Sequence, residues 1–336
     1  MEQALSRAVT TATTMLASSG TRPLRWIADL IQNRNRQGKG ILCSVFCSTS
    51  CCLAVSTAYS SPLINVGFSG DNGQLSNYYS PITRELVVAA TAWEDLFVSG
   101  NAFTLNVNVI FDNSPTANAG SLFSTALYST GPLSVFRQGA VDTVLTGVHN
   151  PSGPYDAAIH IGTSYLINEL WFDPNPANND SVPIDKTDAE SIFLHEFGHI
   201  FAFNGNRDQF TGALQTNTES QFDDLVSFIN NSPYFIGSYA ESVYGGPVPL
   251  TVGNIYHVGN PSGPGADLET YPGDLMNGNI FFRGSRYNIS AVDAAIAADL
   301  GLVVEVAEPD TIAIFCVSLV GFWLTRCSRR SVEARI

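Results

Sequence analysis

The chain has 336 residues, of which 45% are hydrophobic and 11% aromatic, and its formal net charge is −14. This composition argues against an intrinsically disordered middle region and gives room for one large domain or two small ones. Between Tyr59 and Ala307 there are 25 acidic and 6 basic residues. Because so acidic a region repels phosphate backbones, nucleic acid is excluded as an expected partner.

The N-terminal region has the pattern of a secretory signal. Three basic residues within 34–39 precede the apolar run "ILCSVFCSTSCCLAVSTA" at 41–58, which ends in small residues. This order favours export with cleavage after Ala58, and a buried helix is the alternative. We therefore expect residues 1–58 to be an N-terminal extension with a signal peptide, and 59–305 to be the functional domain. All six cysteines lie outside that domain, so it is expected to contain no disulfide framework.

The functional domain begins with alternating helix and strand patterns. Apolar residues at helical spacing predict a helix over 81–98. The stretch "AFTLNVNVIF" alternates apolar with smaller or polar residues and predicts a half-buried strand over 102–111. One or two further strands are predicted within 157–172.

A polar segment follows at 173–185, where frequent Pro and Asn residues predict a loop. Its oxygen-bearing side chains form a candidate Ca²⁺ site without the EF-hand spacing; they are Asp173, Asn175, Asn178, Asn179 and Asp180. A solvated polar loop is the alternative.

The next helix carries the most informative motif of the chain, "LHEFGHIFAFNG" at 194–205. Thr187 and Glu190 fit a capping box that begins this helix. Gly205 fits its termination near Asn204. The motif is therefore expected to lie entirely on one helix.

Within this helix His195 and His199 are four positions apart, so both project from one face and can bind one metal ion. Glu196 is rotated by about 100° from His195 and is not expected to be a ligand. Zinc in hydrolases normally takes three protein ligands and one water, whose pKa it lowers to about 7. Glu196 would take the proton of that water and deliver it to the leaving amine of a peptide. Two histidines satisfied within a core are the alternative.

A third zinc ligand has to come from elsewhere in the chain. Of the five histidines, His149 and His160 precede the helix, and His257 follows His199 by 58 positions. Glu219 is the competing candidate, since it follows His199 after 19 intervening residues and carboxylates also bind zinc.

Four features taken together resemble the leishmanolysin-like branch of the metzincin metalloproteases. They are "HEFGH", His257 in "NIYHVGN", Met276 in "GDLMNG", and a last helix in "ISAVDAAIAADLGL" at 289–302, which Ser290 is expected to cap and Gly301 to stop. The resemblance implies an α+β fold, in which a twisted mixed β-sheet and the active-site helix lie above a loop-rich C-terminal subdomain with a Met-turn. It implies the following site: zinc ligands His195, His199 and His257, the base Glu196, and Met276 as an apolar floor.

The chain departs from the common metzincin pattern, because Ala202 and Gly205 stand where that pattern has a glycine and the third histidine. A rival resemblance is to the thermolysin-like gluzincins, in which Glu219 would be the third ligand and Asp223 would orient a histidine. The asparagine that those proteins have before the glutamate is absent here, and Met276 would have no role. His257 is therefore the preferred ligand, and Glu219 remains the alternative.

The C-terminal segment, 306–336, is similar to the PEP-CTERM sorting signal of Gram-negative bacteria. It combines a Glu-Pro motif, an apolar run of fourteen residues at 311–324 and an arginine cluster at 326–330, although Ala307 replaces the usual first proline. The run is shorter than the roughly 20 residues of a comfortable membrane span. The resemblance implies transient attachment to the inner membrane, processing by an exosortase, and a cell-surface or extracellular destination. An ordinary tail anchor is the alternative.

These features predict an exported zinc-dependent endopeptidase that acts on protein or peptide substrates. A catalytically silent surface or matrix protein that keeps the same fold is the alternative from another class. The presence of Glu196 favours the enzyme, because a silent protein has no need of the base.

Overall fold

The computed structural model describes residues 63–97, 103–149, 153–175, 180–214, 216–259, 273–278 and 281–302. All of them belong to one compact unit, Ser60–Ile336. The predicted signal peptide, the predicted sorting segment and the centre of the candidate calcium loop lie outside the described residues. Among the described helices, none has the length and apolar character needed to cross a membrane.

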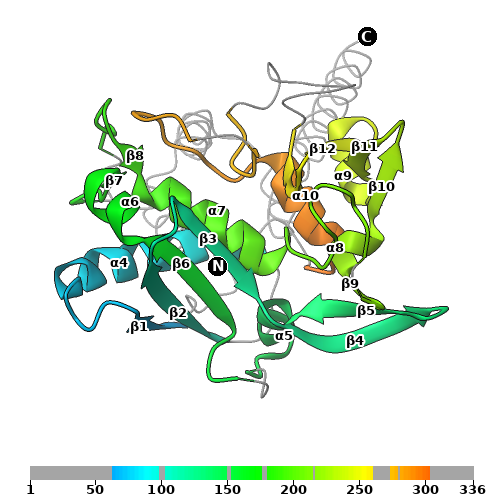
Figure 1. The fold of residues 1–336 in the computed structure, drawn as a ribbon, viewed down its shortest axis with the longest axis horizontal. Helices are drawn as coiled ribbons and strands as arrows, with labels where there is room; N and C mark the ends of the chain where they lie inside the picture. The colour runs from blue at the N-terminus through cyan, green and yellow to red at the C-terminus, as the bar shows by residue number, and fades with distance from the viewer. Residues whose placement is uncertain are drawn as a thin grey trace, which may run out of the picture. The chain divides into compact units, whose positions relative to one another are not determined.

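The fold is α+β, as predicted, and one of its sheets is a mixed sheet with the strand order β1-β2-β6-β3 (Figure 1). The strands are β1 (Leu63–Ser69), β2 (Thr104–Asp112), β3 (Ala117–Ser121) and β6 (Ala157–Gly162). β1, β2 and β6 are parallel, and β3 runs antiparallel to β6 at the edge. The alternation predicted in β2 is confirmed, because every second residue from Leu105 to Phe111 is buried.

Two long helices pack side by side against this sheet, α4 (Ser76–Glu94) and α7 (Ala189–Phe201). Trp93 of α4 is fully buried, and its indole N–H donates to the carbonyl of Leu194 in α7 at 2.9 Å. α5 (Gly139–Thr146) contacts both β2 and α7. The helix predicted at 81–98 is therefore present but begins earlier. Its N-cap is Leu75, whose N–H donates to the carboxylate of Asp71 at 2.8 Å.

The rest of the domain is built from short elements. The short strands are β4 (Phe123–Thr130), β5 (Leu133–Gln138), β7 (Leu170–Trp171), β8 (Thr187–Asp188), β9 (Thr218–Ser220), β10 (Val226–Ile229), β11 (Ser232–Phe235), β12 (Val248–Thr251) and β13 (Asn254–Val258). The short helices are α6 (Thr163–Asn168), α8 (Gln221–Asp224), α9 (Ser238–Tyr244) and α10 (Ala291–Asp299). β10 to β13 form one antiparallel sheet, and β4, β5 and β9 form a mixed one, in which β4 is antiparallel and β9 parallel to β5.

The boundaries of the motif helix differ from the prediction at both ends. The helix ends at Phe201 with Ala202 as its C-cap, so residues 203–205 of the motif lie beyond it. The predicted N-cap, Thr187, pairs with Leu170 of β7 and lies one residue before the observed cap. The cap is Asp188, whose carboxylate accepts the N–H of Ser191 at 3.1 Å. For α10 the predicted cap is confirmed, since Ser290 and Asp293 form a capping box. Gly301, with φ of 90°, stands just beyond its end.

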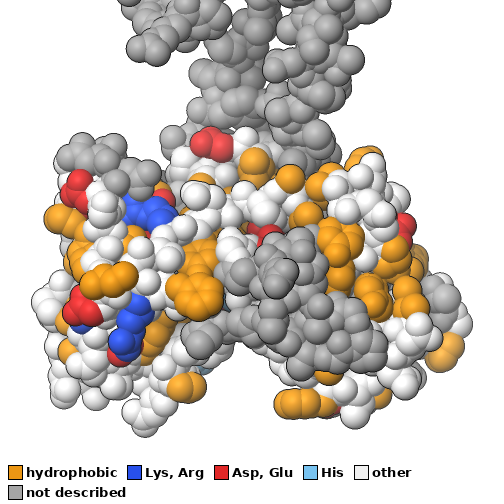
Figure 2. Space-filling model, turned by 90° about the horizontal axis from the view of Figure 1, so that it is seen from above, with side chains coloured by type: hydrophobic (Ala, Val, Ile, Leu, Met, Phe, Trp, Pro, Cys, Tyr) orange, Lys and Arg blue, Asp and Glu red, His pale blue; other side chains and the backbone are white. Residues whose placement is uncertain are grey.

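The surface carries hydrophobic side chains in several separate groups among polar ones, as the face in Figure 2 shows. The most exposed large hydrophobic side chains of the described residues are Ile184 and Phe210, at 85% and 81%. They lie on two different loops, so neither side chain continues the buried face of a helix or strand.

Candidate metal centre

Three histidine side chains converge in the structure, His195 and His199 from α7 and His257 from β13. The Nε2 atom of His195 lies 3.1 Å from that of His199 and 3.2 Å from that of His257. Nitrogen atoms bound to one tetrahedral zinc at 2.0–2.1 Å would lie about 3.3 Å apart. The geometry of this histidine cluster therefore fits three ligands of one zinc ion.

Backbone carbonyls fix the orientation of the two helical imidazoles. His195 Nδ1 lies 2.7 Å from the carbonyl of Leu275, and His199 Nδ1 lies 2.8 Å from the carbonyl of Phe203. Each carbonyl can accept only from a protonated Nδ1, so the proton resides there and leaves Nε2 with a free lone pair. Both rings are thus oriented and in the tautomer that a ligand needs.

The three histidines are also neutral, which is the protonation state that metal binding requires. Burial, together with the neighbouring His199, lowers the pKa of His195 to about 3. Burial lowers the pKa of His199 to about 4 and that of His257 well below its usual value. The imidazoles are therefore neutral at physiological pH. His195 is buried, and His199 and His257 are half-buried.

Glu196 stands next to His195 on the same helix and is only 2% exposed. Its Oε2 atom has no hydrogen-bond partner among the described residues. Burial raises the pKa of this carboxyl to about 8, and a bound cation nearby would lower it again. A buried carboxyl without a protein partner, beside a metal-binding cluster, has the properties of a general base.

The turn at 273–278, called here the Met276 turn, lies directly against the motif helix. Met276 is fully buried, and its Sδ atom occupies the space that a Cβ atom on Gly198 would need, at 2.3 Å. The same turn supplies the Leu275 carbonyl that holds His195. Its Met276 carbonyl accepts the N–H of Val258 at 2.8 Å, next to His257. The Met276 turn therefore contacts both α7 and β13, the two elements that carry the three histidines, and holds them in place relative to each other.

The structure does not bring Glu219, the alternative ligand, into the histidine cluster. Glu219 lies on β9, is 3% exposed, and pairs with Arg207 at 3.3 Å. Among the described residues, His195, His199 and His257 form the group that could hold a metal ion, and Glu219 is not part of it. Glu219 resembles a gluzincin ligand only in its distance from His199 along the sequence.

Asp223 links the segment that follows α7 to the strand β13. It is fully buried and accepts the N–H of Asn206 at 2.7 Å and the hydroxyl of Tyr256 at 3.1 Å. Gly205 permits this contact, since a Cβ atom there would lie 2.3 Å from the carboxylate. Tyr256 precedes His257, so this network sets the position of the third histidine. Asp223 thus orients a tyrosine and not the histidine of the gluzincin pattern.

Phe281 is a component of the site that the sequence did not reveal. Its ring meets the ring of His195 edge to face, with centroids 5.1 Å apart. Tyr287 packs against Phe281 at 4.6 Å and is itself buried, so it has a packing role. The only local signal was the position of Phe281 shortly after the Met276 turn.

Charged residues at the start of α7 form a separate network. Arg286 lies 3.2 Å from Asp173, 3.1 Å from Asp188 and 3.7 Å from Glu190. Asp173 also accepts the N–H of Asn175 at 2.8 Å. This carboxylate of the candidate calcium loop is thus engaged by N–H donors and a guanidinium group. Among the described residues no group of three or more His, Cys, Asp or Glu side chains at this loop is placed to hold a metal ion, and Asn178 and Asn179 lie outside the described residues.

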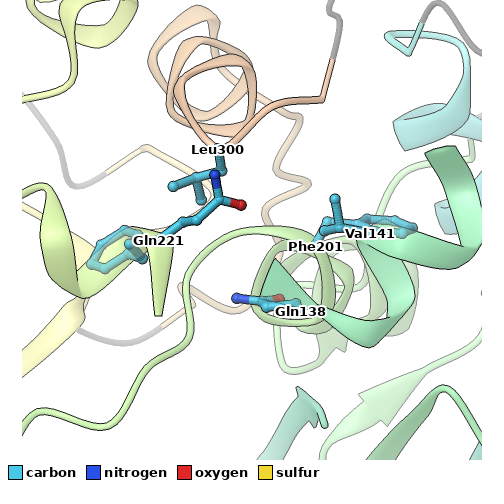
Figure 3. A pocket seen from close by; sticks show the side chains of 6 residues that line it. Gln138, Val141, Phe201, Gln221 and Leu300 are labelled. Atoms are coloured by element: carbon cyan, nitrogen blue, oxygen red, sulfur yellow. The ribbon is translucent and has the colours of Figure 1, made fainter. Parts of the chain in front are cut away.

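A small cavity lies at the other end of α7 (Figure 3). Gln221 and Leu300 lie on one side of it, and Val141 and Phe201 on the other, with Gln138 beside them. Its volume is about 10 Å³, which is room for about one water molecule. This cavity is too small for a substrate, and the histidine cluster remains the candidate site.

Comparison with models of protein families, with curated proteins and with solved structures found no match for this chain. The histidine cluster and the neighbouring Glu196 are therefore the features of the chain that indicate its function.

Proposed function

We propose that the chain is an exported zinc-dependent endopeptidase. One observation supports this proposal above all others: three neutral imidazoles present Nε2 atoms at zinc-ligand spacing beside a buried carboxyl without a described partner. Neutral imidazole is a preferred zinc ligand, and three protein ligands leave the fourth position open for catalysis. A purely structural zinc site would be closed by a fourth protein ligand.

The roles of the chain's own groups follow from this arrangement. His195, His199 and His257 would hold Zn²⁺, which when bound supplies Lewis acidity towards water and the scissile carbonyl. Glu196 would accept the proton of the attacking water and return it to the leaving amine, because a bound cation would offset the effect of burial on its pKa and keep the carboxylate ionised for the first step. Met276 keeps the floor beneath the ligands apolar and dry.

The proposed fold type is metzincin-like. Four features support it: the mixed sheet packed on α7, the distant histidine on β13, the Met276 turn against Gly198, and the terminal helix α10. Protein or peptide substrates are proposed because a zinc-bound water beside the Glu196 carboxyl would suit amide hydrolysis. Export by the N-terminal signal, and sorting by an exosortase through 306–336, remain predictions from the sequence.

The ligand assignment is tested by zinc stoichiometry of the purified full-length chain. We expect one zinc per chain in the wild type and its loss, by at least about tenfold in affinity, in His257→Ala. The matched control is Glu219→Gln, which should keep zinc because Glu219 pairs with Arg207 instead. Zinc loss in Glu219→Gln with retention in His257→Ala would reverse the assignment.

The catalytic assignment is tested by hydrolysis of a diverse peptide library. Glu196→Gln should bind zinc like the wild type and lose activity by at least about 10²-fold. If wild type and Glu196→Gln, both loaded with zinc, are equally inert, the chain is a metal-binding surface or matrix protein and the proposal fails.

A further inference from the structure

The segment 281–287 passes beside the histidine cluster without belonging to a helix or a strand. Phe281, at its start, meets the ring of His195 edge to face, and Tyr287, at its end, packs on Phe281. Because such a segment lacks the regular backbone hydrogen bonds of a helix or sheet, its individual contacts decide where Phe281 stands.

Arg286 anchors this segment to the start of α7. Its side chain is 14% exposed, and its guanidinium group donates to both carboxylate oxygens of Asp188 at 3.1 Å and to Asp173 at 3.2 Å. Both aspartates are buried. A forked contact of this kind fixes the direction of the side chain as well as its distance. Since Asp188 is the N-cap of α7, the segment is fastened to the helix that carries His195.

The residue after Arg286 joins α7 one turn before His195. The N–H of Tyr287 donates to Ser191 Oγ at 2.8 Å, and the Ser191 hydroxyl donates to the Asp188 carboxylate at 2.7 Å. Ser191 and His195 are four positions apart, so they project from the same face of the helix. The end of the segment is therefore held on the face of α7 that presents His195.

Tyr287 in turn holds the start of the segment. Its hydroxyl accepts the N–H of Phe282 at 2.9 Å, and its ring meets that of Phe281 with centroids 4.6 Å apart. We propose that Arg286 is a positioning residue: through this segment it keeps the ring of Phe281 against the imidazole of His195. This role rests on the proposed function, because His195 is one of the proposed zinc ligands.

Two contacts restrain the imidazole of His195. Its Nδ1 lies 2.7 Å from the Leu275 carbonyl, and the ring of Phe281 stands at 88° to it with centroids 5.1 Å apart. Without Phe281 the imidazole could turn, and water could compete for the Leu275 carbonyl. His199 makes the same kind of bond, at 2.8 Å to the Phe203 carbonyl, near the other end of α7. It therefore provides an internal reference for the state of His195.

The test follows the Nδ1-bound protons of these two histidines by NMR in the full-length chain, labelled at its histidine nitrogens. Exchange of each proton with water reports how often its hydrogen bond opens. The signal does not require zinc, because Nδ1 of each helical histidine faces a carbonyl group and Nε2 faces the proposed metal. Zinc affinity is measured on the same preparations.

The variants are Phe281→Ala, Arg286→Lys and the double variant. Lysine keeps a positive charge between the buried carboxylates but cannot make the forked contact. Arg283→Lys is the matched control, because it makes the same replacement in the same segment, at an exposed ion pair with Glu169 that contributes little.

We expect the Nδ1 proton of His195 to exchange at least about tenfold faster in Phe281→Ala and in Arg286→Lys. The proton of His199 should keep its wild-type rate within about twofold. The zinc Kd should rise at least about threefold in both single variants. The double variant should match Phe281→Ala in both quantities, since Arg286 acts through Phe281. Arg283→Lys should match the wild type.

Equal acceleration at His195 and His199 in Arg286→Lys would show a general loosening of the fold and overturn the positioning role. Additive effects in the double variant would overturn it too, because Arg286 would then act by another route. Faster exchange at His195 with an unchanged zinc Kd would overturn the role of the segment towards the metal. If the exchange pattern is as expected in a chain that binds no zinc, the proposed function fails and the positioning of His195 stands.

A milder variant covers the case in which Arg286→Lys does not fold. Tyr287→Phe removes only the hydroxyl that accepts the N–H of Phe282. It should accelerate exchange at His195 and leave His199 unchanged. A wild-type exchange rate at His195 in this variant would refute the proposed path from Arg286 to Phe281.

Discussion

The contact between Gly198 and Met276 allows a quantitative test of how the Met276 turn is packed. An alanine at position 198 would place its Cβ atom 2.3 Å from Met276 Sδ, 2.9 Å from Cε and 3.4 Å from Cγ. Met276 is fully buried and its turn is fixed by carbonyl contacts to His195 and Val258, so it cannot simply move aside. Gly198→Ala should therefore destabilise the fold.

The magnitude follows from opposing effects. Replacing glycine by alanine within a helix stabilises by about 1 kcal/mol, whereas overpacking a fixed core contact costs about 1–3 kcal/mol, here at the upper end. The expected net loss in unfolding free energy is about 1–2 kcal/mol. Met276→Ala alone leaves a cavity and should cost about 2–5 kcal/mol. In the double variant the new methyl group occupies that cavity, so the two losses should not add.

Equilibrium unfolding in urea of the full-length chain and the three variants, with chelator present, completes a double-mutant cycle. The double variant should be more stable than the sum of the single losses implies, by about 1–3 kcal/mol. If the losses add within about 0.5 kcal/mol, Met276 does not press on Gly198 in solution and the packing argument is refuted. Unequal m-values would show that the variants alter the unfolded state instead.

Two further predictions concern groups away from the ligands. Gly205→Ala puts a Cβ atom 2.3 Å from the Asp223 carboxylate, so we expect a loss of about 2–4 kcal/mol in urea unfolding together with weaker zinc binding; wild-type values for both would contradict the role of Asp223 in guiding β13. The pKa of His149 is raised because its ring bonds the Gly153 carbonyl and the Asp156 carboxylate. Its contribution to stability should be full below the usual histidine pKa of about 6.5 and decline as the pH rises through the raised value. NMR titration of the ring and urea midpoints for wild type and His149→Gln would detect this, and an unshifted ring pKa would exclude it.

Local sequence patterns predicted the parts of the site that neighbouring residues determine. The spacing of His195 and His199 sets one face of a helix, because the helical repeat fixes the direction of residues four apart. The Ser290 cap and Gly301 end of the last helix were also predicted, since caps act within a single turn. The same patterns were wrong at Thr187, because this residue pairs with β7 and the N-cap is the next residue, Asp188.

The choice between His257 and Glu219 could not be made from spacing, because both residues can bind zinc and both follow the motif at long range. The tertiary structure separates them by contacts that no local pattern encodes. Arg207 forms an ion pair with Glu219. Asp223 accepts a hydrogen bond from Tyr256 and thereby positions the next residue, His257, beside His195.

The sequence by itself thus determined the fold class, the motif helix and two of the three histidines with their neighbouring carboxyl. Only the tertiary structure decided the third histidine, the contact of Met276 with Gly198, and the place of Phe281 beside His195. The reason is physical: helix geometry and caps depend on residues within a few positions of each other. Strand pairing and core packing, in contrast, bring together residues tens of positions apart, with contacts that depend on the whole fold.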